Sequence, residues 1–210
     1  MTRPQRSPFL ALALAAASLA VATPAAADQA ALLTWSQTAA RGLFQLCRQD
    51  APDAARVGEH GEIWGWPRFM GYLEHPDGYK RQAGGSSRRT FQDGDASTYV
   101  EATVQSGLVT SAAPAEVHYF RCNAASDQPI NADLETYFTD KYGPPAAKTD
   151  QATVWLAGAA KGADPGDDDA ALAAVKSAAA GAEATRVELT HDHGLDRAKL
   201  VLFHNGPVGN

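Results

Sequence analysis

The sequence predicts an α+β fold, in which an antiparallel sheet of about six strands carries helices packed mainly on one face. Three observations lead to this prediction. Apolar residues recur at helical spacing over 32–46, two later segments alternate apolar and polar side chains, and short turn signals join the later segments. Short connections favour antiparallel pairing, because parallel strands need long crossovers.

The first 27 residues have the organisation of a secretory signal peptide. Two arginines precede an apolar run over 9–21, and alanines at 25–27 supply the small side chains that a signal peptidase recognises. The apolar run is too short to cross a bilayer, which takes about 20 residues. We therefore expect cleavage after Ala27, one domain over 28–210, and a periplasmic or secreted location. A retained N-terminal anchor is the alternative.

Cleavage would remove two arginines and no acidic residue, so the formal charge would change from −6 to −8. Such an acidic chain has no electrostatic attraction to nucleic acid or to an anionic membrane. Neither is therefore an expected partner, and an envelope protein or a small ligand is expected instead. With 45% apolar residues, the chain can form a hydrophobic core.

Cys47 and Cys122 are the two cysteines of the chain. In an oxidising compartment this number favours one disulfide, and a single intramolecular pairing exists. On the loop-entropy description, the bridge would stabilise the fold by roughly 4 kcal/mol. Two free buried thiols are the alternative.

The first element of the mature chain is expected to be a helix over 28–50. Its apolar residues recur at spacings of three and four, which places them on one face: Leu32, Trp35, Ala39, Leu43 and Leu46. A second helix is expected to have Asp50 as its N-cap. Gly58 and Gly61 weaken it, so it should end before Trp64.

Turn signals then follow closely at 76–78, 84–86 and 93–95, and they separate two short runs of chain. Strands at 98–105 and 115–122 are expected to continue an antiparallel meander. If the disulfide forms, the side chains of Phe120 and Cys122 should point into the core, because alternate residues of a strand share a face.

Four further elements complete the prediction: a helix over 131–142, a strand at 154–156, a helix at 170–180 within an Ala/Gly/Asp-rich insertion over 157–184, and a hairpin over 185–203. Asn131 can cap the first of these helices, and Gly143 can end it. The last strand carries four consecutive apolar residues at 200–203 and should therefore be central in the sheet.

A candidate metal site lies at the tip of that hairpin, where His191, Asp192, His193 and Asp196 are close together. Imidazole nitrogens and carboxylates are ligands that divalent metals use in proteins. The alternative is a polar hairpin end in which Asp192 and Gly194 form the turn.

Two further candidate sites bind a ligand or partner rather than a metal. Trp64 and Trp66 can form a platform on which a sugar stacks, or they can close the core. Four basic residues surround the glycines at 84–85 and can meet an anionic ligand or an acidic partner: Lys80, Arg81, Arg88 and Arg89. A solvated hairpin rim is the alternative for this basic patch.

Known catalytic patterns are missing from the sequence: Gly-x-Ser-x-Gly, His-Glu-x-x-His, Cys-x-x-Cys and a phosphate-binding glycine loop. The sequence therefore favours a soluble, non-catalytic binding or interaction protein, and no cofactor is expected. One alternative is an envelope metalloprotein or hydrolase that uses the tip at 191–196. Another is an inhibitor or stress-response partner that docks through a hairpin at 80–89.

A post-signal helix with Phe44 and Cys47, a Gly65–Trp66 pair and a strand that ends at Cys122 form a loose pattern. In these features, the chain resembles small exported proteins of unknown function from Gram-negative bacteria. The resemblance covers about the first half of the mature chain. It implies export and a disulfide-bonded scaffold, and it implies no catalytic residues.

Overall fold

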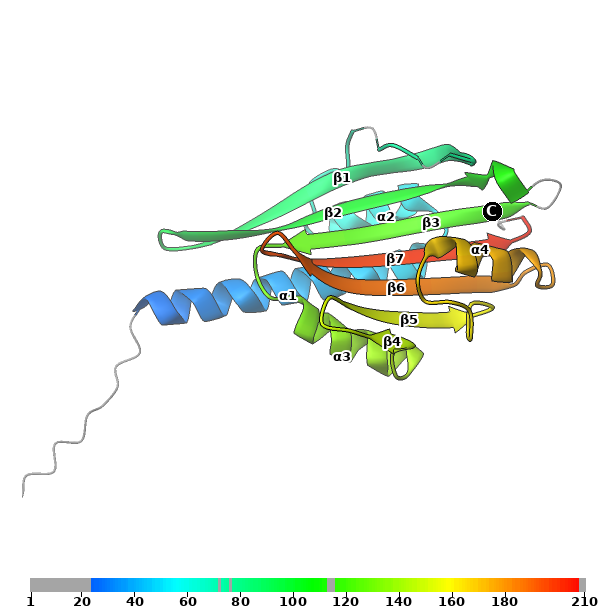
Figure 1. Ribbon diagram of the computed structural model, residues 1–210. Coiled ribbons are helices and arrows are strands. Elements are labelled where there is room, and N and C mark those ends of the chain that lie inside the picture. Colours follow the sequence, from blue (N-terminus) through cyan, green and yellow to red (C-terminus); the bar gives the residue numbers. More distant parts are fainter. Residues whose placement is uncertain (1–23, 72, 76, 113–115, 208–210) are drawn as a thin grey trace, which may run out of the picture.

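An antiparallel sheet forms the centre of the computed structural model, which describes residues 24–71, 73–75, 77–112 and 116–207 (Figure 1). Within these residues seven strands pair in the order β1-β2-β3-β7-β6-β5-β4. The strands are β1 (Tyr79–Asp93), β2 (Ala96–Val109), β3 (Val117–Ser126), β4 (Ala147–Lys148), β5 (Ala152–Gly158), β6 (Glu183–Asp192) and β7 (Leu195–Asn205). The α+β prediction is confirmed, and the short edge strand β4 brings the sheet to one strand more than expected. Most of the predicted signal peptide lies outside the described residues.

The helices are α1 (Pro24–Asp50), α2 (Ala54–Ile63), α3 (Asn131–Tyr142) and α4 (Asp168–Lys176). Helix α1 contacts β1, β2 and β3, whereas α3 contacts β5, β6 and β7. Both helices bury the same side of the sheet, in a cluster that includes Phe44, Leu134, Phe138, Trp155 and Leu200. The half of the sheet formed by β1, β2 and β3 is thus preceded by α1 and α2, and the half formed by β4 to β7 is preceded by α3.

Helix α4 lies on the opposite face of the sheet, within the predicted Ala/Gly/Asp-rich insertion (Figure 1). Its Leu172 and Val175 share a buried cluster with Val201 and Phe203 of the central strand β7. This helix covers one end of its face, because its nine residues are about 13 Å long. The remainder of that face carries polar side chains.

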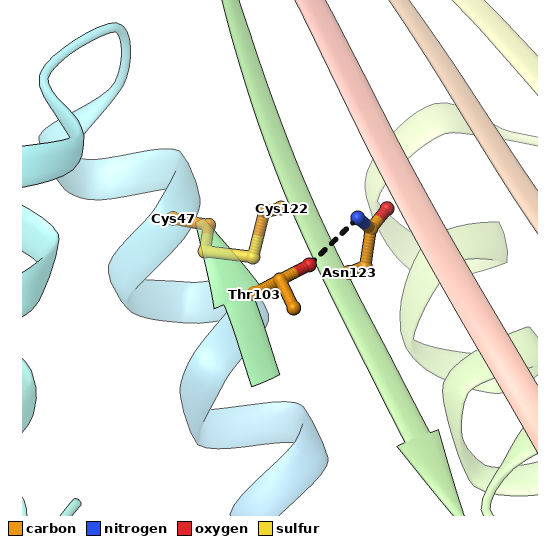
Figure 2. Close-up of a disulfide and its surroundings, with 4 residues drawn as sticks. All are labelled: Cys47, Thr103, Cys122 and Asn123. Atoms are coloured by element: carbon orange, nitrogen blue, oxygen red, sulfur yellow. Dashed lines mark hydrogen bonds between the residues drawn. A yellow bond between two sulfur atoms is a disulfide. The ribbon is translucent and has the colours of Figure 1, made fainter. Parts of the chain in front are cut away.

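The disulfide between Cys47 of α1 and Cys122 of β3 is formed, as predicted (Figure 2). Both side chains are fully buried. Strand β3 alternates as expected, so that Phe120 and Cys122 belong to the cluster beneath α1, whereas Tyr119 belongs to the cluster beneath α4. The bridge therefore joins the longest helix to the middle of the sheet.

The turn predicted at 84–86 is absent, because β1 continues through it as one strand of 15 residues. The glycines there allow the backbone around Met70 to lie close against the backbone of β1. Met70 and Ser86 exchange two backbone hydrogen bonds, of 2.9 and 2.8 Å. A Cβ atom at Gly85 would lie 2.8 Å from the nitrogen of Met70, too close for any side chain. The predicted hairpin at 80–89 is therefore wrong.

Two helix caps differ from the prediction. The oxygen Oδ1 of Asp53, and not Asp50, accepts hydrogen bonds from the backbone of Ala55 and Arg56 at the start of α2. Helix α3 has the predicted bounds, but Ile130 occupies its N-cap position without a side-chain hydrogen bond. The side chain of Asn131 donates instead to the carbonyl of Thr190, 2.7 Å away.

Helix α4 ends at Lys176, four residues before the predicted end. A side chain of β7 contacts this end of the helix. The amide of Asn205 donates hydrogen bonds to the carbonyls of Val175 and Ala178, at 3.1 and 3.0 Å. These bonds add a side-chain donor to carbonyl groups at the C-terminal end of the helix, where intrahelical partners run out.

Candidate functional site

Two tryptophans in the described part of the chain remain about half exposed. Trp35 is 41% exposed and Trp64 is 50% exposed, although tryptophan usually contributes buried area. Both border a hollow of about 380 Å³ between α1, the end of α2 and β1. We call this the aromatic hollow, and it is lined by Trp35, Thr38, Ala39, Arg41, Gly42, Gln45, Trp64, Trp66, Arg89 and Phe91.

Helix α1 sets the dimensions of the aromatic hollow. Trp35 and Gly42 lie on one face of the helix, seven residues apart, which corresponds to about 10 Å along its axis. The indole of Trp64 rests over Gly42, where a Cβ atom would be 3.7 Å from two of its ring carbons. The two indoles therefore bound a slot whose floor is formed by Thr38 and Ala39.

Strand β1 forms the other wall of the aromatic hollow. The ring centroid of Phe91 is 6.2 Å from that of Trp35, with a tilt of 33°. The guanidinium of Arg89 lies 5.3 Å from the Phe91 centroid and donates a hydrogen bond to the carbonyl of Trp64, 3.2 Å away. These contacts hold Arg89 between the two aromatic walls.

The two arginines of the aromatic hollow differ in whether a carboxylate neutralises them. Arg41 pairs with Asp133, and the hydrogen bond that its guanidinium donates to this carboxylate raises the pKa of Arg41 above its ordinary value. Arg89 has no carboxylate partner among the described residues. The lining also contains no aspartate or glutamate. The hollow thus carries one cation that no carboxylate neutralises.

Hydrogen-bond donors outnumber acceptors in the aromatic hollow. Indole, guanidinium and amide groups supply N–H donors, whereas the side-chain acceptors are the oxygens of Gln45 and Thr38. Such a lining can bind a ligand that combines flat apolar faces with hydrogen-bond acceptors.

The two predicted tryptophans have different environments. Trp66 is 3% exposed and belongs to the core, with its ring centroid 6.1 Å from that of Phe69. Its environment agrees with the alternative in which it closes the core. Trp64 points to the surface and leaves one side available to a ligand.

The four predicted basic residues do not form one patch. Arg88 and Arg89 are adjacent in β1 and therefore point to opposite faces of the sheet. Arg88 pairs with Glu101 at 2.8 Å and lies over the ring of Tyr99. Arg81 donates to the carbonyls of Gly71 and Gly84, and Lys80 is exposed at the start of β1. Of the four, Arg89 alone lines the aromatic hollow.

The residues of the predicted metal site lie on the tip between β6 and β7. Nδ1 of His191 is 2.7 Å from Oδ1 of Asp196, whose Oδ2 accepts the backbone N–H of Asn131, 2.8 Å away. Asp196 thereby anchors the start of α3. His193 is exposed and has Asp192 at 3.4 Å.

Among the described residues, no group of three or more His, Cys, Asp or Glu side chains is placed to hold a metal ion. His191 pairs with Asp196 across the hairpin, whereas His204 pairs with Glu183 at the far end. A metal at this tip remains a prediction.

Trp35, Gln45 and Phe91 were not recognised as candidates from the sequence. Trp35 has the spacing of the buried helix face, and no local signal marks it as exposed. The alternation of Arg89 and Phe91 within β1 does place them on one face, and this was the available signal.

The chain matches no family model, no curated protein and no solved structure. In the part of the chain that the structure describes, no helix combines the length and apolar character needed to cross a membrane.

Proposed function

We propose that this is an exported, non-catalytic interaction protein that binds an extended, proline-containing peptide segment in its aromatic hollow. The spacing along α1 between Trp35 and Gly42, over which the second exposed indole rests, carries this proposal. A polyproline II helix rises about 3.1 Å per residue with three residues per turn, so side chains on one side recur about every 9 Å. This repeat is close to the ~10 Å between Trp35 and Gly42, over which Trp64 rests.

The hydrogen-bonding groups of the aromatic hollow support a peptide ligand. A polyproline II segment makes no internal hydrogen bonds, and its carbonyl groups therefore remain available as acceptors. Proline side chains also pack well in aromatic grooves, which is how several peptide-binding domains recognise them. A sugar is a poorer match, because each of its hydroxyl groups also donates a hydrogen bond, and the side-chain acceptors of the lining are those of Gln45 and Thr38.

Arg89 supports a preference for an acidic residue in the peptide. Its guanidinium is held at the edge of the hollow by Phe91 and by the carbonyl of Trp64. A carboxylate of the ligand would find there a cation that needs little reorganisation to form a charge-assisted hydrogen bond.

Export is supported by the N-terminal pattern over 1–27. The buried disulfide is compatible with an oxidising compartment, where such bonds persist. The proposed partner is therefore an envelope or secreted protein, and kinship with small exported Gram-negative proteins remains a prediction.

Fluorescence anisotropy of a labelled peptide tests the proposal. The probe is a short peptide with proline at every third position and one glutamate at its end. Saturable binding is expected, and Trp35→Ala and Trp64→Ala should each weaken it by about tenfold or more, because aromatic anchors dominate such interfaces. Ile63→Ala is the matched control, since Ile63 is 79% exposed and does not line the hollow.

Two results would count against this function. The peptide could fail to bind saturably, or Ile63→Ala could weaken binding as much as Trp64→Ala. Quenching of tryptophan fluorescence by neutral oligosaccharides, lost in Trp64→Ala, would instead assign the hollow to a sugar.

A further inference from the structure

A second hollow lies on the face of the sheet that α4 leaves bare. Side chains of β2, β3, β7 and β6 enclose about 520 Å³ there, a volume within the usual range for small-molecule sites. We call this the sheet groove. It lies on the opposite face from α1 and the aromatic hollow.

Strand register explains why the surface is hollowed at this place. Glu101 pairs with Ala125, and Ala125 pairs with Arg197, so the three residues form one row across β2, β3 and β7. Neighbouring strands are about 4.8 Å apart, which places Glu101 and Arg197 about 10 Å from each other. The short side chain of Ala125 leaves a trough between two long side chains of opposite charge.

The charges along the groove sum to zero, since its lining contains Glu101, Glu188, Arg197 and Lys199. Lys199 is 3.1 Å from Glu188, and both have further partners, since Arg186 pairs with Glu188 and Lys199 pairs with Asp168. Within the described part of the chain, Glu101 pairs only with the exposed Arg88, an interaction of small net energy. Arg197 is exposed and has no carboxylate partner among the described residues. One anion and one cation therefore remain available at the two sides of the trough.

The floor of the groove can pair with a peptide group. In the next row, Asn123 donates from Nδ2 to Oγ1 of Thr103, 2.8 Å away (Figure 2). The oxygen of Asn123 is left as an acceptor, and the hydroxyl hydrogen of Thr103 is left as a donor. An acceptor beside a donor complements the N–H and C=O of a peptide unit.

We propose that the sheet groove is a second binding site, which takes a short zwitterionic peptide such as a free dipeptide. The ligand ammonium would meet Glu101, its carboxylate would meet Arg197, and its peptide group would lie over Asn123 and Thr103. A dipeptide extends over about 7 Å, which allows both ends to reach the side chains that flank the trough.

Isothermal titration calorimetry with three probes tests this assignment: alanyl-alanine, its N-acetyl derivative and its C-terminal amide. Saturable binding of the free dipeptide is expected. Each blocked derivative should bind about tenfold more weakly, because one charge-assisted hydrogen bond is lost.

Variants identify which end of the ligand each side chain meets. Arg197→Gln should weaken binding of the free dipeptide about tenfold and should leave binding of the amide unchanged. Glu101→Gln should also weaken binding of the free dipeptide about tenfold, and it should leave binding of the N-acetyl derivative unchanged. Arg88→Gln should strengthen binding, because Arg88 competes with the ligand ammonium for Glu101.

Arg56→Gln is the matched control, since Arg56 is exposed on α2, beyond the opposite face of the sheet. Trp64→Ala should also leave dipeptide binding unchanged, which separates this site from the aromatic hollow. The assignment is overturned if alanyl-alanine does not bind, if the blocked derivatives bind equally well, or if Arg88→Gln weakens binding.

Discussion

The bridge between Cys47 and Cys122 closes a loop of 75 residues, and its removal has a calculable cost. Loop-closure entropy for this length corresponds to about 4.5 kcal/mol at 25 °C. The suitable perturbation is the double substitution of both cysteines by alanine, because a buried serine would add an unpaired hydroxyl group. Domains of this kind have a total stability of about 5–15 kcal/mol, so the variant should fold with much of its stability lost.

Urea unfolding, followed by the fluorescence of the buried Trp66 and Trp155, measures this loss. The oxidised protein, the reduced protein and the double variant are compared, and thiol titration verifies the oxidation state of each. We expect the midpoint to fall in the reduced protein and in the variant alike. If thiol titration shows that the bridge is formed in the oxidised protein, and the double variant is nevertheless less stable by under about 1 kcal/mol, the entropic explanation is refuted.

Three further changes test individual contacts. Burial would raise the pKa of Glu188, but hydrogen bonds from Arg186 and Lys199 lower it overall. The ionised carboxylate therefore stabilises the fold at neutral pH, and this contribution disappears as the pH falls below about 4.5. Glu188→Gln should accordingly flatten the acid limb of a plot of melting temperature against pH. Gly107→Ala should cost about 3 kcal/mol or prevent folding, measured by urea unfolding, because the added Cβ would overlap a carbonyl oxygen of β1. Ser36→Ala should raise stability by up to about 1 kcal/mol in a thermal melt, since the buried Ser36 hydroxyl has no partner among the described residues; a loss would show that it has one.

Local patterns predicted the elements whose causes are local. The helix over 131–142 has the predicted bounds, because an apolar stripe and Gly143 determine it within a dozen residues. The alternation over 98–105 likewise placed Val100, Ala102 and Val104 in the core.

Trp35 shows where a periodic pattern stops being sufficient. It shares the helix face of Leu32, Ala39 and Leu43, which are at most 5% exposed, yet Trp35 itself is 41% exposed. Periodicity defines a face of the helix, whereas burial at each turn depends on what lies opposite that turn. The glycines at 84–85 are a second case in which the local pattern is not sufficient. The backbone that approaches them is that of Met70, which pairs with Ser86.

The sequence by itself determined the helical and strand periods and the single possible cysteine pair, because each depends on neighbouring residues or on a count, and export stays a prediction from the N-terminal pattern. The tertiary structure alone decided the two hollows. Trp64 reaches Gly42 only after the chain has turned back over α1, and Ala125 separates Glu101 from Arg197 only in the observed strand register. Such contacts join segments distant in sequence, and pairing register is set by the packing of the whole sheet.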